Sequence, residues 1–416
     1  MKILLLSQYF KPENLPINHV AELMSISGFE VEVLTGKPNY PGGQFFKNFG
    51  FFSKIIYYED TIKVYRLPIL PRGKRFKYLT LGINYLSFII SASILAPFLL
   101  NKKKYDFIFV YGTSPILKAL PALLISKIKR IPVVIWVQDL WPQSIVASNY
   151  NLPSFVIRIL EIIVNFIYSR ADLIVCQSNS FISKIESKNR DVNAYYLPNI
   201  ISNIFLDSNN IDPTVSLLLN DYNDSFKLLF TGNIGEAQSI ETVIKAAESI
   251  KEVHPDKNIA FIFIGSGSKL DALQSLVKEK DLNNCHFLGS FPLDLMPSFI
   301  HLSDGLMVSL KDEEIFSLTI PNKIQSYLAS GKPIIASLNG EGAEVIIESN
   351  SGYTSAAEDH LGLAKNILLL MELSEKDRRK LGKNGKKYFK ENFSDEIFIS
   401  NLKNYIEKIS NQGREL

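Results

Sequence analysis

The sequence predicts an α/β protein with two domains, each built on a doubly wound parallel sheet. Its 416 residues exceed the size of one ordinary domain. Short apolar runs rich in Val, Ile and Leu alternate with helical stretches, and this alternation stops at a polar segment and then starts again. Runs of this kind fit parallel strands that helices cover on both faces. Two Rossmann-like domains that face each other across a cleft are therefore expected.

The first domain is predicted over residues 1–198. Its strands are expected at residues 3–6, 31–34, 63–67, 107–110, 133–137, 173–176 and 195–197. The helices between them include residues 20–27 and the very apolar stretch 155–168. This order of elements is a βαβ series, which builds a parallel sheet.

A polar segment after Leu197, rich in Asn, Asp, Ser and Pro, predicts the domain boundary. The second domain is predicted over residues 199–392, and a C-terminal helix at 393–416 is expected to return to the first. The second domain's strands are expected at residues 228–231, 259–264, 286–288, 305–309, 333–336 and 352–354, with helices at 240–250 and 270–280. Open α/β sheets bind ligands at the carboxyl ends of their strands, so the loops there are the candidate sites.

Composition excludes several classes of protein. Hydrophobic residues make up 46% of the chain and charged residues 21%, so large cores can form and a disordered or collagen-like chain is excluded. Two cysteines, Cys176 and Cys285, do not make a disulfide framework or a thiolate metal site, which favours a cytoplasmic protein. The apolar run at residues 3–6 is too short for a secretory signal and is predicted to be a strand.

Positive charge is concentrated in the first half of the chain. Residues 1–200 hold 23 Lys and Arg against 12 Asp and Glu, a net charge of +11, whereas residues 201–416 hold 22 against 30, a net charge of −8. Much of the excess flanks the most apolar stretch, residues 79–100: Arg66, Arg72, Lys74, Arg75, Lys77 and Lys102 to Lys104. This pattern is typical of contact with a membrane surface and does not favour nucleic acid, because the basic residues bracket an apolar segment.

Residues 79–100 would form a helix of about 33 Å, long enough to cross a bilayer. Its polar residues form one helical stripe at steps of four, three and four: Thr80, Asn84, Ser87 and Ser91. A span would also place the strands at 63–67 and 107–110 on opposite sides of the membrane. We therefore predict a helix that lies against the sheet and dips into the membrane interface, and an ordinary core helix is the alternative.

The first candidate binding loop, residues 230–238, follows the first predicted strand of the second domain and precedes a helix. Gly232 and Gly235 allow backbone N–H groups to approach an anion closely, and a helix N-terminus adds favourable partial charge. The pattern predicts a diphosphate cradle that includes Asn233 and Gln238. A tight turn that binds nothing is the alternative.

A second Gly-x-Gly, formed by Gly265 and Gly267, follows another strand of that domain. It is weaker evidence, because it lacks the third glycine of a dinucleotide fingerprint. Farther along, Pro321, Asn322 and Lys323 begin a predicted helix. A lysine in the first helical turn is unfavourable against the positive helix end, which favours an anionic ligand there, and a solvated lysine is the alternative.

In the first domain, Asp139 lies at the carboxyl end of a predicted strand, in a segment that holds both tryptophans of the chain. Its carboxylate is predicted to face the ligand, and capping of the turn is the alternative. Long loops follow the first and second strands. The acceptor-binding candidates are Tyr9, Glu13, Asn14, Asn39, Tyr40 and Trp141. The sequence shows no Cys/His cluster and no Asp-x-Asp pair for a divalent ion, so the protein itself is expected to neutralise a diphosphate.

Together these stretches resemble the retaining glycosyltransferases of family 4, which have the two-domain GT-B fold, along nearly the whole chain. The motifs that carry the resemblance occur in one order: residues 7–10 with 12–13, 34–36 with 38–41, 138–142, 232–235 with 237–238, and 323–328. Within the family, the sequence is most similar to bacterial O-antigen and capsule N-acetyl-L-fucosaminyltransferases and to colanic-acid-type enzymes.

The resemblance implies transfer of a sugar, best assigned as N-acetyl-L-fucosamine, from a UDP-sugar to a polyprenyl-diphosphate-linked saccharide, with no metal or other cofactor. A peripheral protein on the inner face of the cytoplasmic membrane is expected. Asp139 and Lys323 are the predicted catalytic residues. Donor binding is assigned to Gly232, Asn233, Gly235, Gln238, Gly265, Gly267, Pro321, Asn322, Lys323 and Glu341.

The sequence departs from the family at four points. The two glutamates that many members keep eight positions apart are Leu318 and Ser326, which leaves ribose recognition without a residue. No Arg or Lys lies within residues 232–239, so another cation must meet the diphosphate. The frequent histidine of the family is Gln138, and its glutamate after Trp-Pro is Gln143.

Other classes of function stay open at this point. A non-hydrolysing nucleotide-sugar epimerase shares the two-domain architecture but needs no acceptor. A non-catalytic sugar-binding protein of the membrane surface would need no phosphate loops. A glycosyltransferase with a different donor sugar fits the same motifs.

Overall fold

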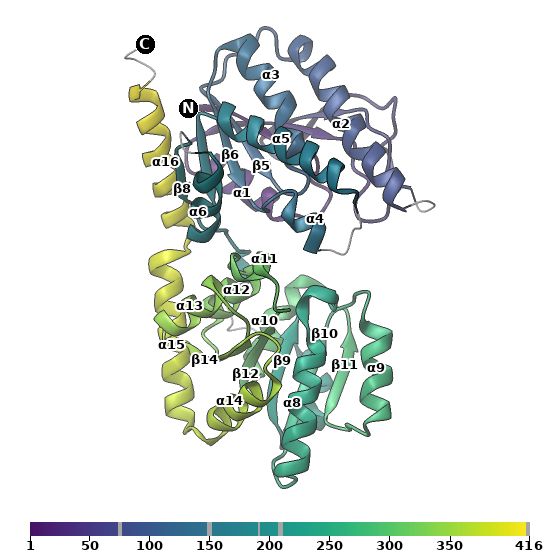
Figure 1. Ribbon diagram of the computed structural model, residues 1–416, viewed down its shortest axis with the longest axis vertical. Helices are drawn as coiled ribbons and strands as arrows, with labels where there is room; N and C mark the ends of the chain where they lie inside the picture. The colour runs from purple at the N-terminus through teal and green to yellow at the C-terminus, as the bar shows by residue number, and fades with distance from the viewer. Residues whose placement is uncertain (74–76, 148–151, 190–191, 207–210, 413–416) are drawn as a thin grey trace. The chain divides into compact units, whose positions relative to one another are not determined.

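The structure is a computed structural model and describes residues 1–73, 77–147, 152–189, 192–206 and 211–412 (Figure 1). The chain divides into two compact units. Unit 1 consists of Met1–Ile200 and Asp395–Leu416, and unit 2 of Ile201–Ser394. The division lies two residues beyond the boundary expected from the polar segment, and the last helix belongs to unit 1. Lys74, Arg75 and the linker asparagines Asn209 and Asn210 lie outside the described residues.

The described part of unit 1 has eight strands: β1 (Lys2–Leu6), β2 (Glu30–Gly36), β3 (Ile56–Glu59), β4 (Ile62–Leu67), β5 (Phe107–Gly112), β6 (Val133–Val137), β7 (Leu173–Cys176) and β8 (Ala194–Tyr196). They form one sheet in the order β3-β4-β2-β1-β5-β6-β7-β8. All neighbours pair in parallel except β3 and β4. The seven strands expected from the sequence lie in this sheet within two residues of their predicted bounds.

β3 was not expected. It is an edge strand that pairs antiparallel with β4, and the chain turns between them at Asp60, whose φ is 55°. Its residues are alternately exposed and half-buried, so it lacks the continuous apolar run of the strands inside the sheet.

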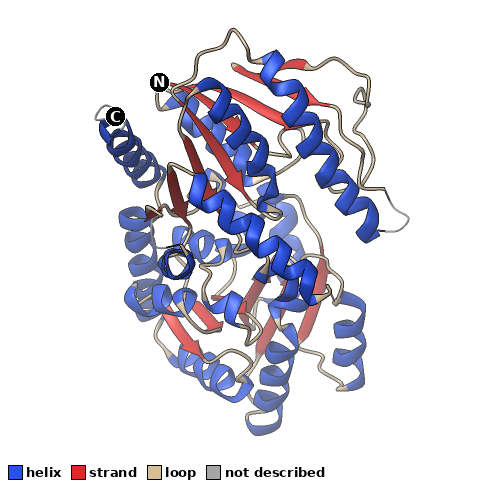
Figure 2. Cartoon of the chain, turned by 45° about the horizontal axis from the view of Figure 1, so that its top comes forward, coloured by secondary structure: helices blue, strands red, loops and turns tan. Residues whose placement is uncertain are grey.

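The helices of unit 1 cover both faces of its sheet (Figures 1 and 2). They are α1 (Pro16–Ile26), α2 (Lys77–Leu99), α3 (Ala119–Lys129), α4 (Gln143–Ala147), α5 (Ser154–Arg170), α6 (Asn179–Lys188) and α16 (Asp395–Gln412). α1 and α16 share a core with alternate strand residues such as Ile3 and Leu5. On the other face, α2 packs against α3 and α3 against α5.

The polar stripe of α2 faces the protein and its apolar stripe faces outward. Asn84 is fully buried, and its side chain bonds to Gln8, Tyr9 and the carbonyl of Leu70. The exposed apolar residues recur at helical spacing: Leu79, Ile83, Leu86, Ile90, Ile94 and Phe98. Within the described residues, the segment Leu79–Leu99 is the one helix long and apolar enough to cross a membrane. However, β4 and β5 lie in one sheet, which a membrane between them would not allow.

Unit 2 has a parallel six-stranded sheet. Its described strands are β9 (Phe226–Thr231), β10 (Ile259–Ile264), β11 (Cys285–Gly289), β12 (Gly305–Ser309), β13 (Ile334–Ser337) and β14 (Gly352–Ser355). They are ordered β11-β10-β9-β12-β13-β14, and every neighbouring pair is parallel. Each lies within two residues of its predicted bounds, so the predicted class of two parallel α/β domains is confirmed.

The helices of unit 2 are α7 (Pro213–Leu218), α8 (Ile240–Val253), α9 (Leu270–Glu279), α10 (Met296–His301), α11 (Glu314–Ser317), α12 (Asn322–Ser330), α13 (Glu341–Glu348), α14 (His360–Glu372) and α15 (Glu375–Asn392). α8 and α14 pack together over the core of the sheet, and α12 packs against α15. α12 ends at Gly331, whose φ of 72° suits glycine at the end of a helix. This stop turns the chain directly into β13.

Candidate functional site

The loop after β9 is tied to the turn after β10 by backbone hydrogen bonds. The N–H of Gly232 donates to the carbonyl of Ile264 (2.9 Å), and the N–H of Ile234 donates to that of Ser266 (2.9 Å). The N–H groups of Gly232 and Ile234 therefore bond to backbone carbonyls and are not free to bind an anion. In the same loop, the N–H groups of Asn233 and Gly235 have no backbone partner among the described residues.

Those two N–H groups belong to Asn233 and Gly235. Asn233 is exposed, and its side chain lies against Gly235, where a β-carbon would meet it at 2.5 Å. The backbone N–H donors left for the predicted cradle are therefore those of Asn233, which is exposed, and Gly235, which is buried.

Gly265 and Gly267 let the two turns touch. A β-carbon on Gly265 would lie 1.8 Å from the carbonyl oxygen of Gly232, and one on Gly267 would lie 2.1 Å from that of Ile234. The φ of Gly265, 145°, also disfavours any residue with a side chain. The Gly265 N–H donates to the carbonyl of Gly289 (2.8 Å). These glycines therefore shape the loop after β9, and their part in binding is indirect.

Lys323, from the first turn of α12, lies on this loop. A β-carbon on Gly232 would lie 3.5 Å from its Cε and 3.7 Å from its Nζ. The ammonium donates to Oε1 of Gln238 (2.8 Å) and lies 3.4 Å from the ring centroid of Phe230. Neither partner carries a negative charge, and burial lowers the pKa of Lys323 well below its ordinary value. Among the described residues this desolvated ammonium has no carboxylate partner, which suits it to an incoming anion.

A second group on α12 contacts the beginning of this loop. Tyr327, one helical turn beyond Lys323, accepts hydrogen bonds at its hydroxyl from the N–H of Thr231 (3.0 Å) and contacts its Oγ1 (3.1 Å). Glu341 is buried in the first turn of α13. Sequence reasoning missed Tyr327, although its spacing of four from Lys323 placed both on one helical face.

Pro321 and Asn322 lie at the beginning of α12, with Asn322 exposed and Pro321 half-buried. A further ionic cluster, also missed, anchors the same loop. Glu236 pairs with Lys269 (2.6 Å) and with Lys311, and the two lysines lower the pKa of Glu236. Because Glu236 neutralises them, Lys269 and Lys311 differ from Lys323, which faces uncharged partners.

In unit 1, Asp139 joins the loops after β5 and β6. Its Oδ2 accepts a hydrogen bond from the N–H of Ser114 (2.8 Å). Ser114 in turn contacts Ser144 through their hydroxyls (3.3 Å). Asp139 is half-buried at the carboxyl edge of the sheet, whereas Trp141 is buried with 9% of its surface exposed. Asp139 is therefore accessible from this edge, and Trp141 mainly packs behind it.

Tyr9 and Tyr40 lie close together, with ring centroids 5.5 Å apart. The guanidinium of Arg72 lies over both rings, 4.9 Å from the centroid of Tyr9 and 4.7 Å from that of Tyr40. Its Nε donates to the Tyr9 hydroxyl (2.9 Å), and the Arg72 N–H donates to the side chain of Asn39 (3.3 Å). The structure thus brings three predicted acceptor residues together around an arginine that the sequence suggested only as a membrane contact.

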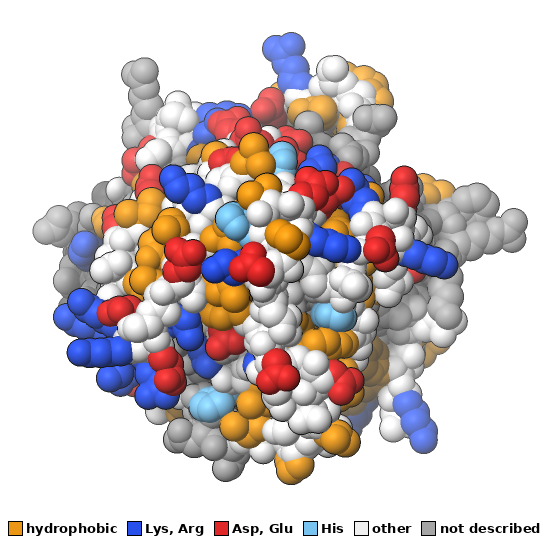
Figure 3. Space-filling view, turned by 90° about the horizontal axis from the view of Figure 1, so that it is seen from below, with side chains coloured by type: hydrophobic (Ala, Val, Ile, Leu, Met, Phe, Trp, Pro, Cys, Tyr) orange, Lys and Arg blue, Asp and Glu red, His pale blue; other side chains and the backbone are white. Residues whose placement is uncertain are grey.

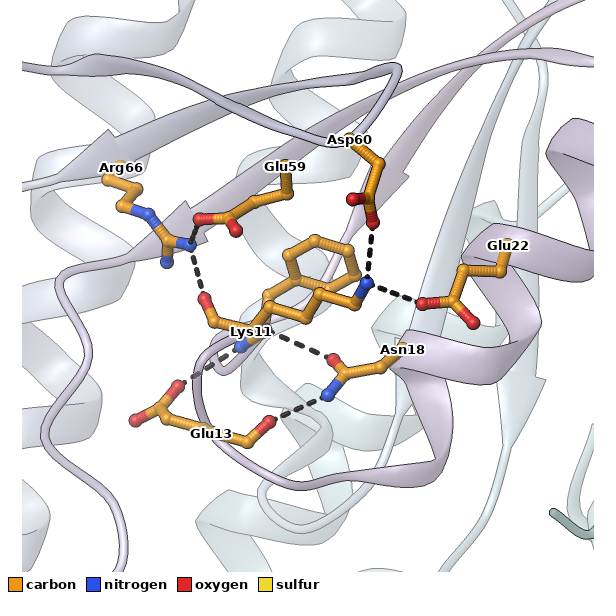
Figure 4. Close-up of polar contacts among 8 residues, drawn as sticks. Lys11, Glu13, Asn18, Glu22, Glu59, Asp60 and Arg66 are labelled. Carbon is orange, nitrogen blue, oxygen red and sulfur yellow. Dashed lines mark hydrogen bonds and ion pairs between the residues drawn. The ribbon is translucent and has the colours of Figure 1, made fainter. Parts of the chain in front are cut away.

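Glu13 joins these loops through its carboxylate, and Figure 4 shows it beside Asn18, whose side chain donates to the Glu13 carbonyl (2.7 Å). Its carboxylate accepts hydrogen bonds from the N–H groups of Phe10 (3.1 Å), Asn39 (2.8 Å) and Tyr40 (2.7 Å). Burial raises the pKa of Glu13 to about 7, although these bonds act the other way. Its oxygens are committed to the backbone, so Glu13 positions the loops. Asn14, its neighbour, is exposed.

Lys118 is a charged residue that sequence reasoning missed. It lies just before α3, with 1% of its surface exposed, and its Nζ donates to Oγ1 of Thr113 (2.5 Å). Burial lowers the pKa of Lys118 to about 7, an effect that the Asp139 carboxylate opposes and the Arg72 guanidinium reinforces. Asp139 and Arg72 therefore both lie close enough to Lys118 to affect its charge. The predicted site residues form two clusters, one in each unit.

Known proteins match this chain both within unit 2 and over most of its length. Residues 219–388, which contain the loop after β9 and Lys323, match the sequence model of the family described as glycosyl transferases group 1. Over 339 residues the chain is 25% identical to the probable glycosyltransferase WbjE of Pseudomonas aeruginosa, covering 79% of this chain and 80% of that protein.

Over 343 residues the chain is also 25% identical to the putative colanic acid biosynthesis glycosyl transferase WcaI of Escherichia coli strain K12, covering 80% and 82% of the two chains. Among solved structures it is similar to Anabaena Alr3699/HepE in complex with UDP, with a TM-score of 0.68 and 15% identity over 98% of this chain and 100% of that one. At this identity the likeness shows the fold.

Proposed function

We propose a specific reaction from two findings: residues 219–388 match the family model of glycosyl transferases group 1, and the fold is that of GT-B glycosyltransferases. The protein transfers a sugar from a UDP-sugar to a polyprenyl-diphosphate-linked saccharide, with retention of configuration and without a metal ion. The similar protein solved with UDP supports the choice of nucleotide. The relatives WbjE and WcaI support a role in polysaccharide synthesis.

The observation that carries the proposal is the position of Lys323 on the Gly232 turn. When a sugar leaves UDP, negative charge develops on the β-phosphate oxygen. Fixed donors and a cation that meet this charge lower the barrier, because they need no reorganisation during the step. The loop after β9 supplies the N–H groups of Asn233 and Gly235, and α12 brings the Lys323 ammonium to the same loop.

In the proposed step, the acceptor hydroxyl oxygen forms a bond to the anomeric carbon as the bond from that carbon to the β-phosphate oxygen breaks. Retention follows when attack and departure occur on the same face of the sugar, and the leaving phosphate then takes the acceptor proton. Asp139 orients the acceptor or a hydroxyl of the sugar. Lys323 stabilises the UDP product.

The finer assignment rests on the sequence resemblance. N-acetyl-L-fucosamine is the proposed donor sugar, and O-antigen or capsule synthesis is the proposed process. A screen of UDP-sugars against lipid-linked acceptors, read by thin-layer separation of the lipid products, tests both. Transfer of a different sugar would replace the donor assignment but keep the reaction class.

The reaction class is tested by replacing Lys323 with Ala and measuring UDP affinity by calorimetry and turnover with donor and acceptor. We expect turnover to fall roughly a hundredfold or more, the usual loss for an oxyanion donor. Lys376→Ala, an exposed lysine of α15, is the matched control and should behave as the wild type. Unchanged UDP affinity and turnover in Lys323→Ala would remove this lysine from the mechanism.

An epimerase is distinguished by omitting the acceptor. Incubation of the protein with a UDP-sugar alone should leave the sugar's configuration unchanged. Formation of an epimeric UDP-sugar without acceptor would overturn the transferase proposal. A sugar-binding protein without catalysis would bind UDP weakly or not at all.

We also propose that unit 1 lies against the inner face of the cytoplasmic membrane. α2, α3 and α5 expose apolar side chains on one side of the unit: Leu79, Ile83, Leu86, Ile90, Ile94, Phe98, Leu124, Ile128, Phe155, Ile159, Ile162 and Phe166. Exposed basic residues accompany them: Lys102, Lys104, Lys127 and Arg130. Apolar surface of this extent, with basic residues beside it, fits an anionic lipid surface. The face drawn in Figure 3, which is seen from below the view of Figure 1, intermixes acidic, basic and apolar side chains.

A further inference from the structure

We infer that Lys118 and Arg72 form an anion site in unit 1 that holds the diphosphate of an amphiphilic acceptor. The inference deepens the proposed function, since it names the group by which the acceptor is held. The site belongs to unit 1 and is separate from the donor loop and Lys323 in unit 2.

Lys118 is a buried cation with little to bind inside the protein. An ammonium has three N–H donors. Within the described residues, the structure gives Lys118 one hydrogen bond, to the Thr113 hydroxyl, and no ion pair. A buried ammonium in this state is costly unless an acceptor group completes its hydrogen bonds.

Arg72 is the second cation, and its described partners are also uncharged. Its guanidinium lies over the rings of Tyr9 and Tyr40 and bonds to phenol oxygens, including that of Tyr85 (3.3 Å). Aromatic stacking fixes the plane of the guanidinium without using the negative charge of a carboxylate. The guanidinium of Arg72 is therefore oriented by uncharged groups and keeps its charge for an oxyanion.

The two cations lie at the carboxyl edge of neighbouring parallel strands: Arg72 bonds to Tyr9 in the loop after β1, and Lys118 bonds to Thr113 in the loop after β5. At this edge the charge of Arg72 disfavours the charged form of Lys118 and so lowers its pKa. Asp139 compensates in part, and it already accepts a hydrogen bond from the N–H of Ser114. A group with two or more negative charges that contacts both cations would turn this repulsion into attraction. A planar guanidinium and a point-like ammonium together suit phosphate oxygens.

The apolar surface beside the site indicates an amphiphile. Arg72 precedes α2, and Asn84 on the inner face of that helix bonds to Tyr9. The outer face of the same helix exposes an apolar stripe from Leu79 to Phe98. One helix thus contacts the anion site on its inner face and presents apolar surface on its outer face. A prenyl chain that ends in a diphosphate has the matching chemistry.

Geranyl diphosphate is the probe for a direct test, because its binding can be measured by calorimetry without any transfer reaction. We expect Lys118→Met and Arg72→Gln each to weaken its binding roughly tenfold to a hundredfold, the range for losing a hydrogen bond to a charged group. UDP binding should be unchanged in both variants. Lys127→Met, an exposed lysine of α3, is the control and should bind geranyl diphosphate as the wild type does.

Folding is monitored through the thermal midpoint. Lys118→Met removes a buried charge and should not lower the midpoint. Weaker binding in a variant of unchanged or higher stability separates ligand contact from structural support. If Lys118→Met proves less stable than the wild type, the binding of geranyl diphosphate by Arg72→Gln tests the anion site independently.

The alternative source of the anion is a phospholipid headgroup. Vesicles with and without phosphatidylglycerol distinguish the two sources. If the variants lose binding to anionic vesicles but keep wild-type affinity for geranyl diphosphate, the acceptor assignment is overturned. If wild-type protein binds geranyl diphosphate through both residues but transfers no sugar, the site stands and the proposed function fails.

Discussion

The ammonium of Lys323 points toward Gly232, and a β-carbon on that glycine would lie 3.7 Å from Nζ. Gly232 has a φ of 130°, a conformation that favours glycine, so the backbone of the turn and not a clash with the lysine accounts for the glycine. The contact joins the beginning of α12 to the end of β9. A cation and the N–H groups for a diphosphate therefore come from two distant segments of unit 2.

Replacing Lys323 by Met should stabilise the unliganded protein. Burial lowers the pKa of Lys323, so folding either holds a desolvated charge or releases a proton. This cost is present in full below the lowered pKa and disappears as the pH rises toward 10.5, the ordinary lysine value. Thermal unfolding from pH 6 to 10 should show a stability gain that shrinks with increasing pH. A difference in stability between Lys323→Met and the wild type that does not change with pH would contradict this account.

Replacing Gly265 by Ala should destabilise unit 2. A β-carbon would collide with the Gly232 carbonyl oxygen at 1.8 Å, and the φ of 145° is strained for alanine. We expect a loss of about 2 kcal/mol or more in the free energy of unfolding. Gly42→Ala is the control, since nothing lies within 4 Å of a β-carbon there. Equal denaturation midpoints for Gly265→Ala and Gly42→Ala would show that the turns at Gly232 and Gly265 can move apart without loss of stability.

Replacing Glu13 by Gln should lower stability, because the amide nitrogen of Gln would face a backbone N–H where an oxygen of Glu13 accepts a hydrogen bond. The expected cost is about 1–3 kcal/mol. Burial raises the pKa of Glu13 to about 7, so its stabilising contribution is full below about 4.5 and is lost as the pH rises through 7. The gap between wild type and variant should therefore narrow from pH 4.5 to pH 8 in urea titrations.

Glu22→Gln is the control for this experiment. Its carboxylate pairs with Lys11 (2.5 Å) on a partly exposed surface, where ion pairs contribute little. A larger loss of stability in Glu22→Gln than in Glu13→Gln would contradict the role given to Glu13.

Replacing Asp139 by Asn should lower turnover while UDP affinity stays unchanged, since Asp139 lies in unit 1. The amide oxygen can still accept the Ser114 N–H, so the fold is kept. We expect a loss of roughly a hundredfold or more, if the carboxylate acts on the acceptor. Asp172→Asn is a close control, because Asp172 accepts a backbone N–H from Val133 (2.7 Å) in the same unit. Wild-type turnover in Asp139→Asn would exclude its catalytic role.

The sequence reveals the strands of this fold because strands buried on both faces are continuous apolar runs. It does not reveal β3, which is short, lies on the sheet edge and exposes alternate residues. Lys323 could be proposed from its place in a helical turn. Lys118 could not, since its function depends on how the loops after β5 and β6 and the segment before α2 meet.

The direction of α2 illustrates the same limit. Helical periodicity places Asn84 and Ser87 on one stripe, but it does not say which stripe faces the sheet. In the structure, Asn84 is buried by polar partners on the loops after β1 and β4, and the apolar stripe is left outside. Those partners come from segments far from α2 in sequence.

The outward apolar stripes lead to a last prediction, on membrane binding. Ile90 of α2 and Ile159 of α5 are 57% and 51% exposed, and burying such side chains in lipid gains about 1.5–3 kcal/mol each. The variants Ile90→Glu and Ile159→Glu should each weaken flotation with phosphatidylglycerol vesicles roughly tenfold or more, because each loses apolar contact and adds repulsion. Ile26→Glu is the matched control: Ile26 is 83% exposed at the end of α1, which covers the other face of the sheet. Transfer to a short-chain acceptor without vesicles should be equal in all three variants. If Ile26→Glu reduces flotation as much as the other two, the binding is not specific to the face formed by α2 and α5, and the peripheral membrane proposal fails.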